Sequence, residues 1–176
     1  MSLRLAAEAE PTPDVSDDEV WLTCIACGAQ FAPFEAVRFT CDNCDGLLEV
    51  RYADHPTFDD FEGHGVWRYS EALPFDKGVS LPEGATPLHE VPRLREEVGL
   101  RALSSKHAGM NATGAFKDRG MTVGVRVAQE LDVDALACAS TGNTSAALAT
   151  YGGRAGMPTL VLLPQGKVAA GKIAQA

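Results

Sequence analysis

Four of the five cysteines form two C-x2-C pairs that are separated by 13 residues: Cys24, Cys27, Cys41 and Cys44. Each pair can place two thiolates on one tight turn, so that two turns supply four sulfurs to a tetrahedral ion. Four protein ligands leave no open coordination position, and the pattern therefore predicts a structural zinc site. Four buried free cysteines are the alternative. A redox C-x-x-C is disfavoured, because neither pair begins a helix after a βαβ-type strand.

A single lysine, Lys117, lies in the segment NATGAFKDRG at the predicted start of a helix. A cation is poorly placed there, because the N-terminus of a helix carries a partial positive charge. A lysine amine that forms a Schiff base loses this mismatch and gains a chemical role. The alternative is a solvated lysine in a first helical turn. For Asp118 and Arg119 we expect an ordinary charge pair on the outer face of that turn.

A second polar segment, ASTGNTSAAL, follows a predicted apolar strand and leads into a predicted helix. Ligands bind at the carboxyl ends of the strands in open α/β sheets. The segment suits a carboxylate or phosphate at a helix N-terminus, although the same residue types are also ordinary helix caps. Its candidate binding positions are Ser140, Thr141, Gly142, Asn143 and Thr144.

The elements that must position these residues fall into two parts. Residues 20–52 form a predicted β-rich zinc ribbon with three strand-like runs, VWLTC, FEAVRFTC and LLEVRY, each beside a cysteine pair. Residues 1–19 lack periodicity and are predicted to be a flexible tail. Residues 53–80 contain scattered glycine and proline, which predicts a connector with little regular structure that packs against the next domain.

Residues 81–176 alternate between strand and helix patterns. After the loop-rich LPEGATPLHEV, we expect a short strand in RALSSKHA, a helix over 117–131 and a buried strand in ALACAS, in which Cys138 is a small buried residue. NTSAALATYGGRAG predicts a helix that ends at Gly156, MPTLVLLP predicts a strand, and VAAGKIAQA opens another helix. This alternation predicts an α/β domain with right-handed βαβ units and a parallel sheet. The last helix has no cap, so we expect the fold to continue beyond Ala176.

Three of these segments resemble one known family. KHAGMNATGAFKDRG resembles the cofactor-lysine segment of pyridoxal-phosphate (PLP) enzymes of the tryptophan-synthase-β type (fold type II), and especially of threonine synthases. EGATPL and STGNTSAALATYGGRAGMPTLVLLPQGKVAAGKIAQ resemble two further blocks of that family, and the four-cysteine ribbon resembles one branch of threonine synthases. The resemblance covers residues 20–176 and implies a three-layer parallel-sheet fold, which is incomplete in this chain.

The resemblance also implies roles for individual residues. Lys117 would bind PLP covalently and later move protons, Phe116 would pack at the cofactor, and Asn143 would hydrogen-bond the ring hydroxyl. Ala115 stands where the family often has serine, and Asn-Ala-Thr stands where it usually has Asn-Pro-Thr. The family's glycine-rich phosphate loop and the group facing the pyridine nitrogen lie beyond Ala176.

The implied reaction converts O-phospho-L-homoserine and water to L-threonine and phosphate. Ser140, Thr141 and Thr144 would grip the substrate carboxylate. Lys106 would lie near the substrate phosphate, with a strand-end surface lysine as the equal alternative. Cysteate synthase, threonine dehydratase and cysteine synthase share the same blocks, and the ribbon favours threonine or cysteate synthase among them.

Charge argues against a different class of protein, a zinc-ribbon binding module attached to an inactive remnant. The net charge is −9, and residues 1–80 hold 16 acidic and 5 basic residues. Nucleic-acid phosphate favours a basic surface, and the predicted ribbon has only Arg38 and Arg51 as basic residues.

No apolar run approaches the ~20 residues of a membrane span, and the N-terminus lacks the apolar core of a secretory signal. We expect a cytoplasmic enzyme with a small-molecule amino-acid substrate and with no nucleic-acid or membrane partner. A monomer and a homo-oligomer are both compatible with the sequence.

Overall fold

The computed structural model describes residues 19–163 of the chain. The chain divides into two compact units, one up to Pro56 and one from Thr57 onward. Within the described residues, every helix is too short or too polar to cross a bilayer. The finer division into tail, ribbon, connector and catalytic part stays a prediction. The helix expected in VAAGKIAQA lies outside the described residues.

The first unit is a small antiparallel sheet with the strand order β2-β1-β3. Its strands are β1 (Val20–Cys24), β2 (Gln30–Phe31) and β3 (Leu48–Tyr52). Leu22 pairs with Phe31 on one side and with Val50 on the other. The first cysteine of each pair, Cys24 and Cys41, is buried in the core of this unit. The cysteine side chains therefore replace much of the apolar core that so small a unit cannot build.

One predicted strand, FEAVRFTC, is wrong. Residues 34–41 form turns and bends, and Phe39 is 88% exposed. Arg38 holds this segment in a folded-back path, because its guanidinium lies 5.0 Å from the centre of the Phe31 ring and donates to Asp42 at 3.0 Å. A two-residue strand, β2, pairs with β1 in its place. The runs VWLTC and LLEVRY do form strands, as predicted.

The second unit contains a parallel βαβ element. Strand β6 (Leu136–Ala139) is joined to strand β7 (Thr159–Leu162) through helix α3 (Asn143–Ala155), and the two strands pair in parallel. Gly156 ends α3 in the left-handed conformation at φ +71°, as its position in the sequence predicts. This element confirms the expected α/β class with parallel strands.

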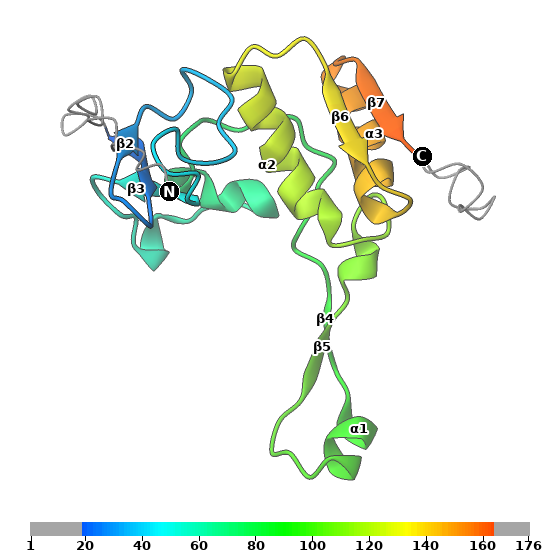
Figure 1. Cartoon of the computed structure of the whole chain (residues 1–176). Coiled ribbons are helices and arrows are strands. Elements are labelled where there is room, and N and C mark those ends of the chain that lie inside the picture. The colour runs from blue at the N-terminus through cyan, green and yellow to red at the C-terminus, as the bar shows by residue number, and fades with distance from the viewer. Residues whose placement is uncertain (1–18, 164–176) are drawn as a thin grey trace, which may run out of the picture. The chain divides into compact units, whose positions relative to one another are not determined.

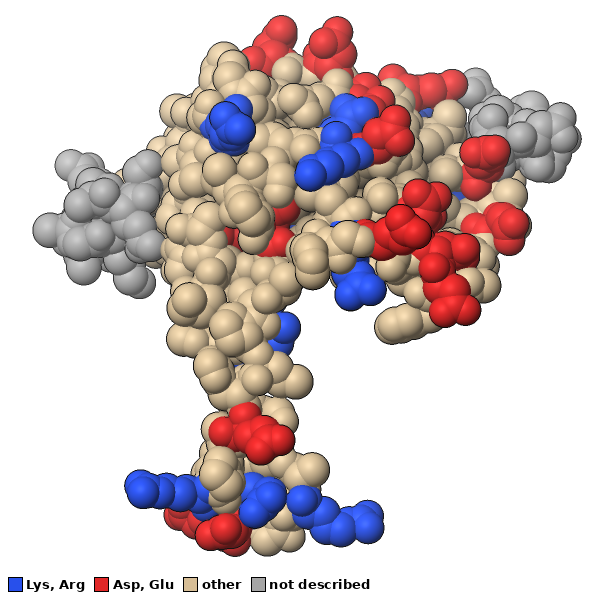
Figure 2. All heavy atoms as spheres, turned by 180° about the vertical axis from the view of Figure 1, so that it is seen from behind, with Lys and Arg blue, Asp and Glu red and all other residues tan. Residues whose placement is uncertain are grey.

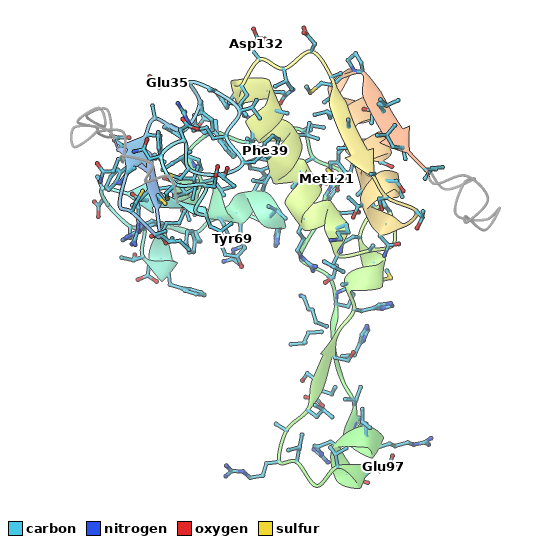
Figure 3. The ribbon with its side chains drawn as sticks, viewed as in Figure 1. Glu35, Phe39, Tyr69, Glu97, Met121 and Asp132 are labelled. Atoms are coloured by element: carbon cyan, nitrogen blue, oxygen red, sulfur yellow. The ribbon has the colours of Figure 1, made fainter. Side chains whose placement is uncertain are left out.

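Helix α2 (Lys117–Glu130) packs beside α3 in this unit. Their shared core contains Val125, Leu136, Leu148 and Tyr151, and Met121 on α2, labelled in Figure 3, packs against it. Figure 1 shows the two helices beginning at the same end of the unit, the end at which β6 stops. The sequence pattern predicted this helix within one residue at its C-terminus.

The segment before this core contains two short 3-10 helices, η1 (Phe58–Asp60) and η2 (Val66–Ala72). Trp67 on η2 is buried, and its indole N–H donates to the hydroxyl of Thr122 on α2 at 3.0 Å. The same hydroxyl donates to the carbonyl of Val79 at 2.5 Å. The Thr122 side chain on α2 therefore holds both ends of the segment between Trp67 and Val79 against the core of the second unit.

A hairpin arm extends from this unit (Figure 1). It consists of strand β4 (Leu88–Glu90), helix α1 (Pro92–Glu97) and strand β5 (Ser104–Lys106), with β4 and β5 antiparallel. All six strand residues are exposed. Figure 2 shows Lys and Arg side chains gathered at the far end of the arm. The strand expected in RALSSKHA is β5, whereas β4 and α1 were not predicted.

Candidate functional site

The four paired cysteines converge in the first unit. Their Sγ atoms all lie within 4.8 Å of one another, with 3.6 Å between Cys24 and Cys44 and 3.6 Å between Cys27 and Cys41. Sulfurs at about 2.3 Å from a tetrahedral zinc lie about 3.8 Å from each other, whereas a disulfide needs about 2 Å. The spacing fits four ligands of one metal ion and does not fit two disulfides.

The two cysteine turns have the same backbone conformation. In each turn, the N–H of the residue four positions after the first cysteine donates to that cysteine's carbonyl, at 3.0 Å from Gly28 and 2.9 Å from Asp45. The N–H of each first cysteine donates to the carbonyl five residues later, at 2.9 and 2.8 Å. Gly28 and Asp45 both have positive φ, +76° and +58°. Glycine meets this requirement without strain, and aspartate is among the residues that tolerate it.

The environment of the sulfurs favours a bound cation. The backbone N–H of Cys27 lowers the pKa of Cys24 to about 6, against the effect of burial. The N–H of Gly46 acts to lower the pKa of Cys44, but the neighbouring thiols of Cys27 and Cys24 raise it to about 12. The cluster therefore holds a first thiolate readily and resists further negative charge, which a metal ion would compensate.

The glycine after the second pair lies against these sulfurs. A Cβ atom built at Gly46 would lie 2.8 Å from Sγ of Cys24 and 3.2 Å from Sγ of Cys44. A Cβ atom cannot lie so close to a sulfur without displacing it, so position 46 must be glycine for the four sulfurs to converge.

In the second unit, Lys117 is the first residue of α2 and is partly buried. Its amine lies 5.0 Å from the centre of the Phe116 ring, and none of the ion pairs in the described part of the chain includes it. Phe116 is 59% exposed, so its ring is available to pack against a ligand. The lysine therefore begins a helix with no carboxylate partner, which is the setting that suits amine chemistry.

The expected charge pair of Asp118 and Arg119 on an outer face is wrong. Asp118 is fully buried and accepts the backbone N–H of Thr113 at 2.7 Å as well as the Thr113 hydroxyl. Arg119 instead donates to the hydroxyl of Thr86 at 2.9 Å. A buried carboxylate needs hydrogen-bond donors, and Thr113 supplies two to Asp118. These bonds hold the loop that precedes Lys117 against the first turn of α2. Sequence spacing could have indicated this, since an Asx or ST residue just before a helix is a usual partner for a first-turn acid.

The polar loop after β6 is held by its own hydroxyls. The N–H of Gly142 donates to Oγ of Ser140 at 3.3 Å, and the buried hydroxyl of Ser145 donates to the carbonyl of Gly142 at 2.6 Å. Asn143 is the exposed first residue of α3, and within residues 19–163 its amide has no hydrogen-bond partner. Ser145 was not predicted from the sequence, and its burial shows that it shapes the loop.

Figure 1 shows that α2 and α3 begin at the same end of the unit, so Lys117, the first residue of α2, and the loop that precedes α3 both lie at that end. Thr144 lies in the first turn of α3. Two helix N-termini at one end of a sheet favour anionic ligands. Lys106 lies at the end of β5, where its amine donates to the carbonyl of Thr86. Lys106, which is predicted to contact a phosphate, and Arg119 therefore both donate a hydrogen bond to Thr86.

The segment EGAT is tied to the rest of this end by buried contacts that sequence reasoning missed. Glu83 is buried and accepts the hydroxyl of Tyr151 on α3 at 2.9 Å. The N–H of Gly84 donates to the side chain of Asn111 at 2.9 Å, and the Asn111 amide donates to the carbonyl of Ala108 at 2.7 Å. The EGAT segment and the loop before Lys117 are thus joined directly.

A family model of pyridoxal-phosphate dependent enzymes matches residues 79–176. The chain belongs to this family. It is 53% identical over 161 residues to a threonine synthase of Methanosarcina acetivorans, a match that covers 88% of this chain and 40% of that protein. It is 50% identical over 164 residues to a threonine synthase of Methanocaldococcus jannaschii, which covers 87% and 40%.

A threonine synthase of Mycobacterium leprae is 54% identical over 98 residues, which covers 56% of this chain and 27% of that relative. The chain spans about 40% of the length of the two archaeal relatives. Matches over 88% and 87% of the chain also extend through the four-cysteine unit, so the likeness is not confined to the family's cofactor-lysine blocks.

Proposed function

We propose that this chain is part of a PLP-dependent threonine synthase, which converts O-phospho-L-homoserine and water to L-threonine and phosphate. The observation that carries the proposal is Lys117, a helix-initiating lysine without a carboxylate partner, at the same end of the unit as the loop of Ser140 and Thr141. The identities of 53% and 50% to proteins named threonine synthase support the choice of substrate.

The residues at this end fit a PLP molecule. The amine of Lys117 would hold the cofactor covalently, the exposed Phe116 ring would cover one side of it, and the unpartnered amide of Asn143 would donate to its ring hydroxyl. PLP, when bound, supplies an electron sink for negative charge that develops on the substrate carbon. Lys117, once free, accepts and returns protons at its Nζ, because no carboxylate competes for that amine.

The substrate would be held by the loop and by the cations near it. Hydroxyls of Ser140, Thr141 and Thr144 and the N-terminal N–H groups of α3 suit a carboxylate. Lys106 would lie toward the substrate phosphate. The positive ends of α2 and α3 favour both anionic groups of such a substrate over a neutral one.

The four cysteines would hold a structural zinc ion. The convergence of the four sulfurs within 4.8 Å and the matching backbone hydrogen bonds of the two turns support this assignment. With all four positions filled by sulfur, the ion would stabilise the first unit and take no part in the reaction. We also propose a cytoplasmic location.

Borohydride reduction followed by peptide mass spectrometry tests the cofactor lysine. After incubation of the chain with PLP, the PLP mass should be found on the peptide that contains Lys117. It should disappear in Lys117→Ala and persist in Lys77→Ala, a matched change at an exposed lysine. Labelling of Lys117→Ala at the wild-type level would refute the assignment.

The substrate is tested on the full-length protein that contains these residues. Incubation with O-phospho-L-homoserine should yield threonine and phosphate. Incubation with O-phosphoserine and sulfite should yield no cysteate. Formation of cysteate without threonine would assign the protein to the other phosphorylated-substrate branch and overturn the proposed reaction while leaving the PLP assignment intact.

A further inference from the structure

Two histidines lie on the same face of the hairpin arm, near the end that joins the second unit (Figure 1). His89 on β4 is paired with Ser105 on β5, and the pairing continues beyond β5, because the N–H of His107 donates to the carbonyl of Pro87 at 2.9 Å. Side chains two residues apart in a strand point to the same face, so His107 is the diagonal neighbour of His89. Their ring centres lie 5.8 Å apart, with 56° between the ring planes. The two imidazoles therefore lie side by side on different strands.

Both imidazoles are accessible to a ligand. His89 and His107 are exposed, and none of the ion pairs within residues 19–163 includes either of them. The residue at position 109 is a glycine, and a Cβ built there would lie 3.3 Å from Nε2 and 3.4 Å from Cδ2 of His107. A side chain at this position would crowd the ring nitrogen, whereas Gly109 leaves it open.

The spacing of the rings fits two ligands of one metal ion. An imidazole nitrogen lies about 2.1 Å from a zinc ion that it ligates, which places the ring centres of two such ligands about 4.5–5.2 Å apart at octahedral or tetrahedral angles. The observed 5.8 Å is slightly longer, and exposed side chains make adjustments of this size by rotation about χ1 and χ2. The backbone of the arm therefore needs no change to bring the two nitrogens to one ion.

The arm has little else to hold its two strands together. No residue of β4, α1 or β5 is buried, and each strand has only three residues. A two-stranded hairpin without a buried face is marginally stable in water. A metal ion bonded to both strands would close the 17 residues between His89 and His107 into a loop and so restrict the open arm.

We propose that His89 and His107 together bind one divalent transition-metal ion of the zinc, nickel and copper class. Imidazole suits these ions, and two protein ligands leave the other coordination positions to water. The site differs in kind from the four-cysteine cluster, which has no open position and lies in the first unit. Binding of the ion would fix the pairing of β4 with β5 and order the arm. The inference does not depend on the proposed function, because it uses no residue of the proposed cofactor or substrate site.

Titration with Ni²⁺ tests the site in the chain to which one equivalent of zinc has first been added for the cysteines. Calorimetry should show one Ni²⁺ ion bound per chain, and the paramagnetic ion should broaden the imidazole C–H resonances of His89 and His107 first. The chain has four histidines, and the resonances of His55 and His64 should stay sharp at that stage. Broadening of His55 or His64 before the pair would overturn the proposal.

Substitution of either histidine distinguishes a chelate from two independent side chains. His89→Ala and His107→Ala should each weaken Ni²⁺ binding about tenfold or more, since the second ligand acts at a high effective concentration. His64→Ala removes an exposed histidine elsewhere in the second unit and should leave the affinity unchanged. Unchanged affinity in both ligand variants, or an equal loss in His64→Ala, would mean that the rings form only an aromatic contact and would overturn the proposal.

A variant that gains affinity excludes misfolding as the cause of the losses. Ser105 is exposed and is paired with His89, so Ser105→His adds a third imidazole on the same face and should tighten Ni²⁺ binding about tenfold or more. Hydrogen exchange measured by mass spectrometry should also slow at the N–H of His107, which donates to Pro87, when the ion holds the strands together. An affinity that Ser105→His leaves unchanged, together with unchanged exchange, would show that no ion bridges the strands.

Discussion

The hydroxyl of Tyr151 donates to the carboxylate of Glu83 at 2.9 Å, and both side chains are buried although they lie 68 residues apart in the sequence. The same carboxylate accepts the hydroxyl of Ser80 at 3.1 Å and the N–H of Leu81 at 2.8 Å. This one carboxylate therefore fastens the EGAT segment to α3. Through that helix, the carboxylate links the segment of Thr86, to which Lys106 and Arg119 donate, with the polar loop after β6.

Removal of the Tyr151 hydroxyl should weaken this link. Tyr151→Phe keeps the ring in the core but leaves Glu83 one donor short, and we expect a loss of about 1–3 kcal/mol in the free energy of unfolding. Urea unfolding of the second unit measures the change. Tyr69→Phe removes a hydroxyl from a partly exposed ring and should change stability by less than about 0.5 kcal/mol. Equal effects of the two variants would mean that the buried bond carries no special weight.

Stability should also depend on pH through Glu83. Burial alone would raise the pKa of Glu83, but hydrogen bonds from the N–H groups of Leu81 and Glu83 and from the hydroxyls of Tyr151 and Ser80 lower it below its ordinary value. The carboxylate thus stabilises the folded unit above the ordinary carboxyl pKa, and this contribution is lost as the pH falls through the lowered folded value. Unfolding measured from pH 7 to pH 3 should show a shallower pH dependence in Glu83→Gln than in the wild type. Identical slopes would contradict the assignment.

Asp118 should protect the loop that precedes Lys117. In Asp118→Ala, the N–H of Thr113 loses its acceptor, and we expect faster amide hydrogen exchange at Thr113 together with a loss of about 1–3 kcal/mol in stability. Asp134→Ala, a change at an exposed aspartate, is the comparison for the loss of one negative charge. Exchange at Thr113 that stays at the wild-type rate would show that another group holds the loop.

Metal removal should affect the first unit alone. We expect one equivalent of zinc in the purified chain and its loss in Cys41→Ser, whereas Cys138→Ser keeps it because this cysteine lies outside the cluster. Each unit contains one of the two tryptophans, Trp21 in β1 and Trp67 in η2. A chelator should therefore shift the indole N–H resonance of Trp21 and leave that of Trp67 in place. Retention of the metal by Cys41→Ser would exclude four-sulfur ligation.

Two glycines in the helices should respond to alanine with opposite signs. A Cβ at Gly152 would lie 3.1 Å from Cδ1 of Leu136 and closer still to the hydroxyl of Thr159, so Gly152→Ala should destabilise the unit by about 1–3 kcal/mol. A Cβ at Gly124, on the exposed side of α2, would meet nothing within 4 Å. Gly124→Ala should stabilise the unit by about 0.5–1 kcal/mol through helix propensity. Thermal unfolding of the pair provides the comparison.

Periodicity and spacing predicted most of the second unit's core. The apolar runs located β6 and β7, the small-residue pattern located α3, and Gly156 marked its end, because all of these signals are local. The cysteine spacing likewise predicted a four-sulfur cluster. Strand β4 and helix α1 of the hairpin arm escaped prediction. The strand is short and exposed along its whole length, so it has no alternation of apolar and polar residues, and the helix has only six residues.

The errors came from specific side-chain contacts that composition and periodicity do not reveal. FEAVRFTC has the composition of a strand, but Arg38 draws it back over Phe31. Asp118 and Arg119 look like a surface pair in sequence, yet the first is buried on Thr113 and the second reaches Thr86, 33 residues upstream. Lys117 and the loop at Ser140 were predicted as site residues from their surroundings and from the family resemblance, and those assignments stay predictions.

The matching backbone of the two cysteine turns has a consequence for the order of assembly. Each turn is closed by its own short-range hydrogen bonds, so each can present two sulfurs before the other has formed. An ion captured by either turn then needs only the closure of the intervening 13-residue segment, an entropic cost that grows slowly with loop length. The first unit thus has two starting points for nucleation around metal. Damage to one turn should slow its loading with metal but should not abolish the first capture step.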